Sequence, residues 1–402
     1  MPERRLSQTE FIVMLAMLYA TVAFSIDSML PALPQIADEL ADGAVNRAQL
    51  VLTFFMLGMG AGTLFAGPLS DTFGRKRTIT AGIGIYLVGS ILATMAPTFE
   101  LLLLARVLQG VGAAAPRIVG VAMVRDLYEG RMMARITSFV MMIFILFPAV
   151  APAIGTLIIA GFGWRGVFAA FVIFGIMGAT WLNLRQGETL PATRRRPFRP
   201  ANLISGTREI LSHRVVVIYT IVITLGFGQM FAMLSSTQQI YDVIFDKADS
   251  FPYWFAFGAI IAGSGTFLNA TLVLQLGMRK LAMWAYGGQA LISIALLAAT
   301  LLDAIPAGWG FSVYFLWSVS VFFMAGLTFG NLNALALQPL GHIAGLAASV
   351  VGAISTVLAM AVAAPIGLAF NGTLVPLLVG TLACSGAAYL LMRTTIEQPE
   401  RP

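Results

Sequence analysis

Long apolar runs separated by short polar turns extend along almost the whole chain. A membrane-spanning helix needs about 20 mostly apolar residues to cross roughly 30 Å of hydrocarbon. By this measure we place spans in the first half at 10–32, 48–70, 78–97, 101–124, 135–159 and 164–184. In the second half we place them at 214–238, 252–275, 280–302, 310–334, 343–369 and 371–392. The pattern predicts an all-α membrane protein with twelve transmembrane helices in two pseudo-symmetric six-helix bundles.

A polar, basic segment interrupts the apolar pattern near the middle of the chain. We expect an N-terminal six-helix bundle over 1–184, a cytoplasmic basic linker over 185–213 and a C-terminal six-helix bundle over 214–402. Residues 201–212, which include Arg208 and Glu209, are compatible with either a short surface helix or a plain linker.

Composition supports the membrane interpretation. Hydrophobic residues make up 58% of the 402 residues and charged residues only 10%, whereas a soluble domain has about 25% charged residues. The single cysteine, Cys384, excludes an internal disulfide, and with only His213 and His342 beside it we expect no metal site and no cofactor. The chain contains no G-x-x-x-x-G-K-[S/T] phosphate-binding loop, which argues against an ATP-driven pump.

The basic residues are sorted by membrane side. Of the 24 Lys and Arg residues, nineteen fall on the side that holds the N-terminus, the linker and the C-terminus, and only Arg47, Arg165 and Lys247 fall on the other. Lys and Arg concentrate in cytoplasmic loops, so we expect both termini in the cytoplasm. This sorting explains the net charge of +6 without nucleic acid. We read the first apolar run as a span rather than a cleaved signal peptide.

The segment GPLSDTFGRKR, from Gly67 to residue 77, connects the second and third predicted spans. Gly67 and Gly74 permit close helix approach and a tight turn, and Arg75 begins a basic run that faces anionic headgroups. We expect Asp71 to form a cytoplasmic latch by pairing with Arg125 or with the nearby Arg131. The alternative is an ordinary positive-inside loop.

This segment resembles the signature loop of the major facilitator superfamily. The sequence LARVLQGVGAAAPR resembles the second motif of that family, with Arg106 and Gln109 at matching positions. The corresponding loop in the second half keeps Gly277 and Arg279 but lacks the aspartate, which predicts a weaker latch there.

Two further segments resemble the drug:proton antiporter branch of the superfamily. One is ILFPAVAPAIG, with Pro148 and Pro152, although Ala151 replaces the usual glycine. The other is IDSMLPALP at the end of the first span, in which Asp27 is followed by Pro31 and Pro34. In the fifth span Pro148 and Pro152 each remove a backbone hydrogen bond, so we expect a kink there that serves gating. Segments 124–139, 265–280 and 342–353 resemble the bicyclomycin/chloramphenicol-resistance (Bcr/CflA) subfamily.

Three charged residues lie well inside predicted spans: Asp27, Arg106 and Arg117. A charge at the bilayer centre costs at least about 2.5–3.5 kcal/mol and usually marks a functional site. At 1.5 Å rise per residue, Asp27 and Arg106 each lie about 9 Å to the periplasmic side of the midplane, so we expect them to meet. Burial favours a neutral carboxyl and a neighbouring arginine favours the carboxylate, so these residues are candidates for proton coupling. The alternative is a static ion pair.

We expect a substrate cavity lined by flexible apolar side chains and a few neutral polar groups. The candidate lining residues are Tyr19, Phe24, Gln109, Phe227, Met230, Met233 and Asn331. Ordinary helix packing is the alternative for each of them.

The resemblance implies a monomeric, multi-pass transporter of the bacterial inner membrane, and not an enzyme. It would export lipophilic, drug-like small molecules in exchange for protons by alternating access. Two other functions stay open, namely proton-coupled transport of one specific metabolite and a non-transporting membrane sensor, because a shared fold does not fix function.

Overall fold

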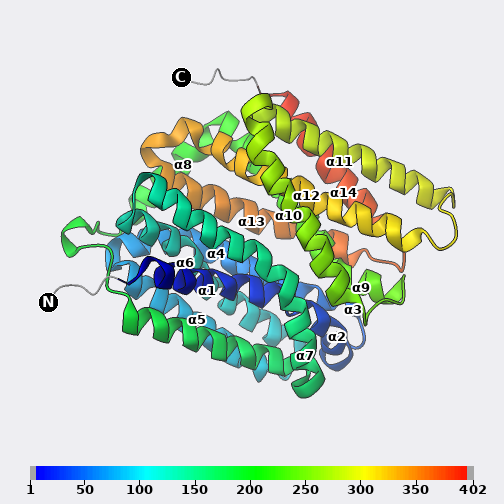
Figure 1. Ribbon diagram of the computed structural model, residues 1–402, viewed down its shortest axis with the longest axis horizontal. Coiled ribbons are helices and arrows are strands. Elements are labelled where there is room, and N and C mark those ends of the chain that lie inside the picture. Colours follow the sequence, from blue (N-terminus) through cyan, green and yellow to red (C-terminus); the bar gives the residue numbers. More distant parts are fainter. Residues whose placement is uncertain (1–5, 396–402) are drawn as a thin grey trace. The chain divides into compact units, whose positions relative to one another are not determined.

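The computed structural model describes residues 6–395, except the side chains of residues 134, 138, 141–146 and 202. Every regular element in that range is helical (Figure 1), which confirms the all-α prediction. The first helices are α1 (Gln8–Asp27), η1 (Leu30–Ala32), α2 (Leu33–Leu40), α3 (Val45–Ala48), α4 (Leu50–Phe73), α5 (Arg75–Thr94), α6 (Phe99–Leu127) and α7 (Gly130–Arg185). They are followed by η2 (Ala192–Arg194), α8 (Pro200–Ser212), α9 (Arg214–Val243), α10 (Phe251–Leu276), α11 (Met278–Leu301), α12 (Gly310–Leu337), η3 (Gln338–Ile343), α13 (Ala344–Leu368) and α14 (Val375–Arg393).

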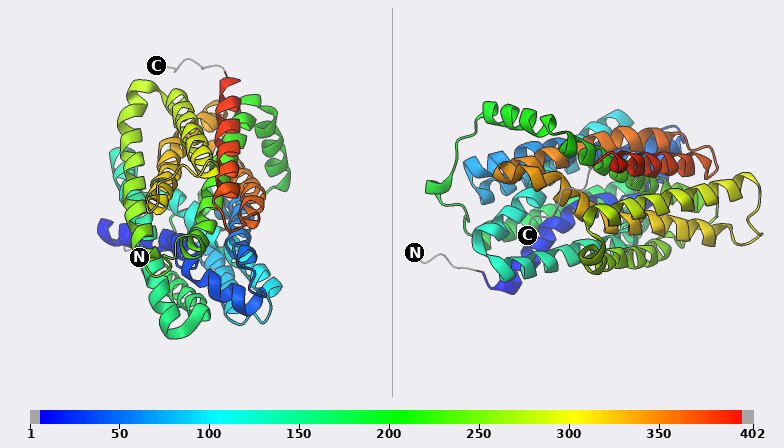
Figure 2. Two further views of the ribbon diagram at one scale, coloured as in Figure 1. Left: turned by 90° about the vertical axis from the view of Figure 1, so that its right-hand side faces the viewer. Right: turned by 90° about the horizontal axis from the view of Figure 1, so that it is seen from above.

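The chain forms two compact units, Met1–Leu203 and Ile204–Pro402, and the division falls inside α8. In the first unit α6 packs against α1, α4 and α5, and α7 packs against α1 and α5, as Figure 2 lets the reader follow from two sides. In the second unit α12 packs against α9, α10 and α11, while α14 packs against α9 and α11. The same packing order therefore occurs in both units.

Two long helical runs contain breaks. Within α7, Gly163 has φ 66° and ψ −176°, a conformation that favours glycine. Between α12 and α13, η3 contains the non-helical Leu340. Ten helical runs within residues 6–395 are long and apolar enough to span a membrane, and the runs 147–185 and 310–368 contain these two breaks.

Two predicted helix boundaries differ from the structure. The first predicted span continued to residue 32, but α1 ends at Asp27. Pro31 and Pro34 explain this, because each lies at the start of a new helix, where a missing N–H costs nothing. The last predicted span began at residue 371, but α14 begins at Val375. The sequence also predicts that Asn371 and Gly372 supply the turn before this helix, and this is confirmed: Gly372 has φ 81°, and the Asn371 side chain accepts a hydrogen bond of 3.2 Å from the backbone N–H of Thr373.

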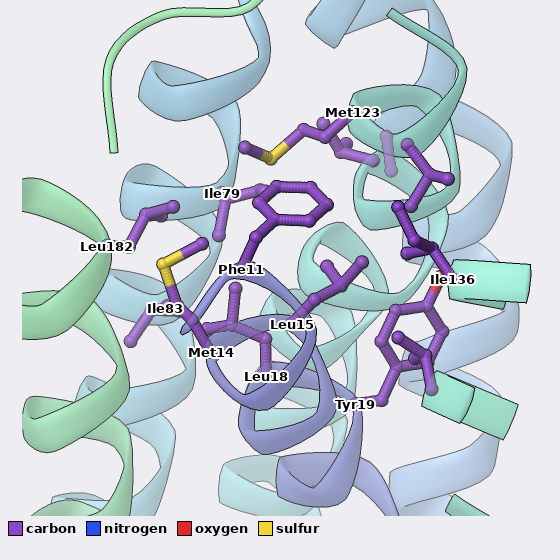
Figure 3. Packing of buried hydrophobic residues seen from close by; sticks show 14 residues of the cluster. Phe11, Met14, Leu15, Leu18, Tyr19, Ile79, Ile83, Met123, Ile136 and Leu182 are labelled. Atoms are coloured by element: carbon purple, nitrogen blue, oxygen red, sulfur yellow. The ribbon is translucent and has the colours of Figure 1, made fainter. Parts of the chain in front are cut away.

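A buried apolar cluster joins α1, α4, α5, α6 and α7 of the first unit (Figure 3). Its fully or nearly fully buried members are Phe11, Met14, Leu15, Leu18, Tyr19, Ala66, Ile79, Ile83, Val119, Met123, Val124, Ile136, Val140 and Leu182. Nearby, α6 approaches α4 so closely that a Cβ at Gly110 would meet the carbonyl oxygen of Phe55. This contact explains why the motif in α6 carries a glycine there.

The segment left open as linker or helix forms the surface helix α8. Glu209 of α8 pairs with His342 at 2.8 Å, and a Cβ at Gly206 would contact Leu346. The surface-helix interpretation is therefore correct. Arg4, Arg5 and Arg401, which contributed to the orientation argument, lie outside residues 6–395.

Candidate functional site

Arg106 of α6 lies at the centre of a buried polar network in the first unit. Its side chain is completely buried, and its three nitrogens donate to three different acceptors. Nε donates to the carbonyl of Val51 at 3.0 Å, Nη2 to the carbonyl of Ser25 at 2.9 Å, and Nη1 to Oε1 of Gln109. The guanidinium also lies 4.4 Å from the ring centroid of Phe55. Arg106 thus ties α1 and α4 to α6.

The network continues from Gln109 into α5. Nε2 of Gln109 donates to the hydroxyl of Ser90 at 2.8 Å, and Ser90 donates to the carbonyl of Tyr86 at 2.8 Å. The Tyr86 and Ser25 hydroxyls lie 2.7 Å apart, which closes the network back to α1. Gln109 is completely buried, so in this structure it supports Arg106 instead of facing an open cavity.

Asp27, the last residue of α1, is 5% exposed. It forms no ion pair and no hydrogen bond with any residue that the structure describes. The predicted contact between Asp27 and Arg106 is therefore wrong, since the guanidinium is bound to the backbone of Ser25, two residues earlier. The sequence placed both side chains at similar depth but did not reveal that backbone oxygens take the place of the carboxylate.

Arg117 also lies on α6 and is half-buried. It interacts electrostatically with the Tyr19 hydroxyl of α1. Three residues after Arg117, a Cβ at Gly120 would lie 2.9 Å from the Tyr19 ring, so α1 and α6 approach closely here. The structure therefore places Tyr19 of α1 against α6 at Gly120, one turn after Arg117, which the sequence did not predict.

Arg75 is the centre of the second polar network, where α4, α5 and α6 end or begin. Its guanidinium is bound by Asp71 at 2.5 Å, Asp126 at 2.9 Å and the Ser70 hydroxyl at 2.7 Å. Arg75 is only 6% exposed. A planar guanidinium suits such multiple contacts, because it presents its donors in a fixed geometry.

The latch predicted for this region involves different partners. Arg125 and Arg131 are exposed, and Asp71 pairs with Arg75 instead. Asp126 was missed, although it directly follows Arg125 in the sequence. Asp126 lies in segment 124–139, and the resemblance of that segment to the subfamily was the signal that could have pointed to it.

The segment after α7 packs on this network. One oxygen of Glu188 accepts the backbone N–H of Arg75 at 2.8 Å, so Glu188 caps the start of α5. Thr189 donates to Asp126 at 3.1 Å. Gly74 has φ 101°, and a Cβ there would collide with Glu188. Gly67 lies within α4, so the signature segment is mostly helix with a one-residue turn at Gly74.

Pro148 and Pro152 both lie inside α7, whose only non-helical residue is Gly163. The backbone dihedral angles therefore stay helical through both prolines, and Gly163 breaks the run between the fifth and sixth predicted spans. Thr156 donates to the carbonyl of Pro152 at 3.0 Å, which satisfies one acceptor in this region. The kink at Pro148 and Pro152 and its role in gating stay predictions.

The aromatic candidate Phe24 packs against other aromatic rings of its own unit. Its centroid lies 5.2 Å from that of Phe171, 5.4 Å from Phe174 and 5.9 Å from Phe147. Edge-on and tilted contacts of this kind are the preferred geometry for aromatic pairs. This adaptable aromatic cluster is compatible with both packing and ligand contact.

The candidates of the second unit lie on α9 and α12. The Phe227 centroid is 4.4 Å from that of Phe329, Met233 is fully buried beside the Tyr314 hydroxyl, and Asn331 donates to Asn269 at 2.7 Å. Met230 is half-buried on α9. Their lining of a cavity stays a prediction.

Residues 15–365 match the sequence profile of the Major Facilitator Superfamily. The chain belongs to the major facilitator superfamily. It is therefore a multi-pass membrane protein and a secondary transporter rather than an enzyme, and its family implies a small-molecule substrate.

Two bacterial relatives support the predicted branch of this superfamily. The chain is 29% identical over 351 residues to a bicyclomycin resistance protein homolog of Haemophilus influenzae, covering 86% of this chain and 85% of that protein. It is 28% identical over 374 residues to the multidrug resistance protein MdtL of Escherichia fergusonii, covering 91% and 90% respectively. These matches confirm the resemblance to the bicyclomycin/chloramphenicol-resistance subfamily.

A solved structure shows the same fold at lower identity. The partially occluded, inward-open xylose transporter XylE of E. coli matches with a TM-score of 0.75 and 13% identity, covering 98% of this chain and 99% of that one. At this identity the likeness concerns the fold alone.

Proposed function

We propose that this superfamily member is a proton-coupled multidrug efflux transporter of the bacterial inner membrane. It exports lipophilic, drug-like compounds by alternating access, works as a monomer, and has twelve spans with both termini in the cytoplasm. The names of its bacterial relatives support the drug substrate. Flexible Met and Phe side chains suit varied apolar ligands.

The proposed topology rests on the two helical breaks. Ten helical runs have the length and composition of a span. The 56-residue α7, which is broken at Gly163, and the 59-residue run 310–368, which is broken at Leu340, are each long enough for two spans. Division at those breaks gives twelve spans. The sorted Lys and Arg residues then favour cytoplasmic termini. The proposed domains are residues 1–184 and 214–402, joined by the linker 185–213.

Asp27 is the observation that supports proton coupling. Among residues 6–395 it is the one acidic side chain in the buried class, and it has no ion-pair or hydrogen-bond partner there. A carboxyl with no structural partner can gain and lose a proton without breaking a bridge between helices. The acid that α9 carries, Asp242, is half-buried and lies one residue from the helix end.

Arg106 has a positioning role in this proposal. Because its hydrogen bonds fix the backbone of Ser25 to α6, the end of α1 is held while Asp27 changes its protonation state. Protonation removes a charge whose placement in the bilayer costs at least about 2.5–3.5 kcal/mol. A proton that moves inward supplies about 2.3 kcal/mol per 100 mV of membrane potential, before any pH gradient.

The test is export by the purified full-length protein in proteoliposomes with an imposed pH gradient. Chloramphenicol and a cationic dye serve as substrates, and a pump-deficient bacterium provides the matching tolerance assay. We expect Asp27→Asn to abolish export driven by the gradient. Asp242→Asn, which neutralises a less buried acid, is the matched control and should transport normally. Full gradient-driven export by Asp27→Asn would remove the basis of the proposal.

A further inference from the structure

The surface helix α8 exposes large apolar side chains although it lies outside the ten apolar helical runs found within residues 6–395. Ile204 is 69% exposed and Leu211 is 46% exposed. In a span such side chains face lipid tails, whereas outside a span they face water unless another surface covers them. The exposed apolar residues of α8 therefore call for a partner surface.

These apolar residues share one face of α8 with an arginine. Ile204, Arg208 and Leu211 are spaced four and three residues apart, which places them on one side of a helix. All three are exposed, and we call them the outer face of α8. The ion pairs among the described residues do not include Arg208, so its charge is available to a partner.

The opposite face of α8 packs within the second unit. Ile210 is 1% exposed, and a Cβ at Gly206 would collide with the side chain of Leu346 in α13. Glu209 pairs with His342 at 2.8 Å, just before α13 begins. These contacts hold α8 against the start of α13, so the outer face points away from that helix.

The same contacts fix the level of α8 relative to the spans. Leu346 is the third residue of α13, which belongs to the apolar run 310–368. The next span, α9, begins at Arg214, two residues after α8 ends. Because two spans begin beside α8, the helix lies at the boundary where hydrocarbon gives way to headgroups.

The charge on and beside the outer face has one sign. Arg208 lies on this face, and the exposed His213 and Arg214 follow the end of the helix. Glu209 is the only acid between residues 200 and 214, and it is paired with His342. A second copy that met this face symmetrically would place like charges together. An apolar stripe with arginine at a bilayer boundary instead fits an anionic lipid surface.

We propose that the outer face of α8 binds anionic phospholipids of the cytoplasmic leaflet. The headgroup phosphate accepts hydrogen bonds from the Arg208 guanidinium, and Ile204 and Leu211 contact the upper part of the acyl chains. Bound lipid thereby holds the segment that connects the two units at the bilayer surface. The choice of leaflet rests on the proposed topology, whereas lipid binding itself does not.

The test measures backbone hydrogen exchange of residues 200–213 in the full-length protein, in nanodiscs that hold one copy each. One set of discs contains phosphatidylcholine alone, and the other contains phosphatidylcholine mixed with phosphatidylglycerol. We expect exchange in α8 to be about fivefold slower with the anionic lipid, because one arginine near an anionic surface contributes about this factor. Equal exchange in the two lipid compositions would overturn the proposal.

Variants of the outer face separate lipid binding from a general effect on folding. Arg208→Gln should lose the difference between the two lipids, and Arg208→Lys should keep it. Arg393→Gln removes the same charge from an exposed position at the end of α14 and should also keep it. Unchanged exchange in α5 shows that each variant is folded. A full difference between the lipids in Arg208→Gln would contradict the proposal.

Discs that hold two copies test the other occupant of this face. Slower exchange in α8 only with two copies per disc, in either lipid, would assign the outer face to a second copy and overturn lipid binding. The assay uses neither a gradient nor a drug, so it is independent of the export assay. Slower exchange with anionic lipid in a protein without gradient-driven export would sink the proposed function and leave the lipid surface. Normal export with equal exchange in both lipids would do the reverse.

Discussion

Ser90 is the sixteenth residue of α5 in the first unit, and Ser293 is the sixteenth residue of α11 in the second. Each buried serine hydroxyl accepts a hydrogen bond from a side chain of the next long helix. Gln109 is the donor in the first unit at 2.8 Å, and the indole N–H of Trp317 is the donor in the second at 3.0 Å. The two units thus keep one contact between corresponding helices and make it with different residues.

The difference increases one turn earlier on the same helices. Arg106 lies three residues before Gln109, whereas Tyr314 lies three residues before Trp317, and both Arg106 and Tyr314 are completely buried. Arg106 makes three hydrogen bonds to α1, α4 and α6, while the Tyr314 hydroxyl lies 4.0 Å from the sulfur of Met233. The first unit therefore holds its helices with a charge, and the second does so with aromatic packing.

The turns that precede α5 and α11 show the same contrast. Lys76 donates to the carbonyl of Asn183 at 2.9 Å, and Arg279 donates to the carbonyl of Met392 at 2.9 Å, so each unit binds the end of its last helix. Only the first unit adds the two carboxylates around Arg75. The two units thus share the contact to the last helix but differ in the charge around it.

The largest difference in thermal stability between the two units is expected for Arg106→Ala compared with Tyr314→Phe. Loss of Arg106 leaves the Ser25 and Val51 carbonyls buried without these donors, and each such group costs about 1–3 kcal/mol. Thermal unfolding in detergent should show a large fall in the midpoint temperature for Arg106→Ala and a small one for Tyr314→Phe. Arg106→Lys should not restore stability, because one ammonium cannot reach three separate acceptors.

An equal fall in the unfolding midpoint of Arg106→Ala and Tyr314→Phe would contradict this difference between the two units. So would a stable Arg106→Ala protein that transports normally, because the end of α1 would then be held by other contacts. Size-exclusion profiles before heating establish that each variant folds.

The sequence located the unusual residues of the first unit but not their partners. Arg106, Gln109 and Asp27 were recognisable because charged and amide groups are rare in apolar spans. Two partners of Arg106 are backbone carbonyls, those of Val51 and Ser25, and no residue type marks a backbone atom as an acceptor. The prediction therefore joined the arginine to the acid that was visible in the sequence.

The prediction of helix ends was limited in a similar way, because local hydrogen bonds decide where a helix begins and ends. The apolar pattern predicted each long helix of the second unit to within a few residues, because spans of this length leave little freedom. It failed at α1, where prolines start new helices, and it began the last helix at 371 instead of Val375. The turn expected at Asn371 and Gly372 is present, but its length depends on hydrogen bonds from the Asn371 and Thr373 side chains, which periodicity does not report.

The second-largest difference in thermal stability is expected for Arg75→Gln compared with Arg279→Gln. Arg75→Gln leaves two neighbouring carboxylates, Asp71 and Asp126, without their cation, at a cost of about 2–3 kcal/mol for a partly buried site. Arg279→Gln removes hydrogen bonds to Thr395 and Met392 but leaves no unpaired charge. Thermal unfolding should therefore fall further for Arg75→Gln, and high salt should narrow the gap because it screens the exposed Asp71.

A double variant gives the control for this prediction. Asp126→Asn should recover part of the stability lost in Arg75→Gln, since it removes one of the two unpaired charges. A double variant that is less stable than Arg75→Gln would mean that charge is not the cause.

A third, smaller effect is expected from Ser90→Ala compared with Ser293→Ala. Each change removes one buried hydrogen-bond acceptor, for a cost of about 1–2 kcal/mol. Ser90→Ala should cost more, because Gln109 then loses the contact that orients it toward Arg106. Double-variant cycles with Gln109→Leu and Trp317→Phe measure each pair separately. A larger coupling energy for the pair in the second unit would reverse the comparison.

The smallest effect is expected from two acids on either side of the division between the units. Glu188 accepts the backbone N–H groups of Arg75, Thr189 and Leu190, so Glu188→Ala should cost about 1 kcal/mol. Glu209 forms an exposed pair with His342, and such pairs contribute about 0–1 kcal/mol. Glu209→Ala should therefore leave the unfolding midpoint nearly unchanged. If Glu209→Ala destabilised the protein as much as Glu188→Ala, then α8 would hold the second unit as firmly as the capping carboxylate holds the first.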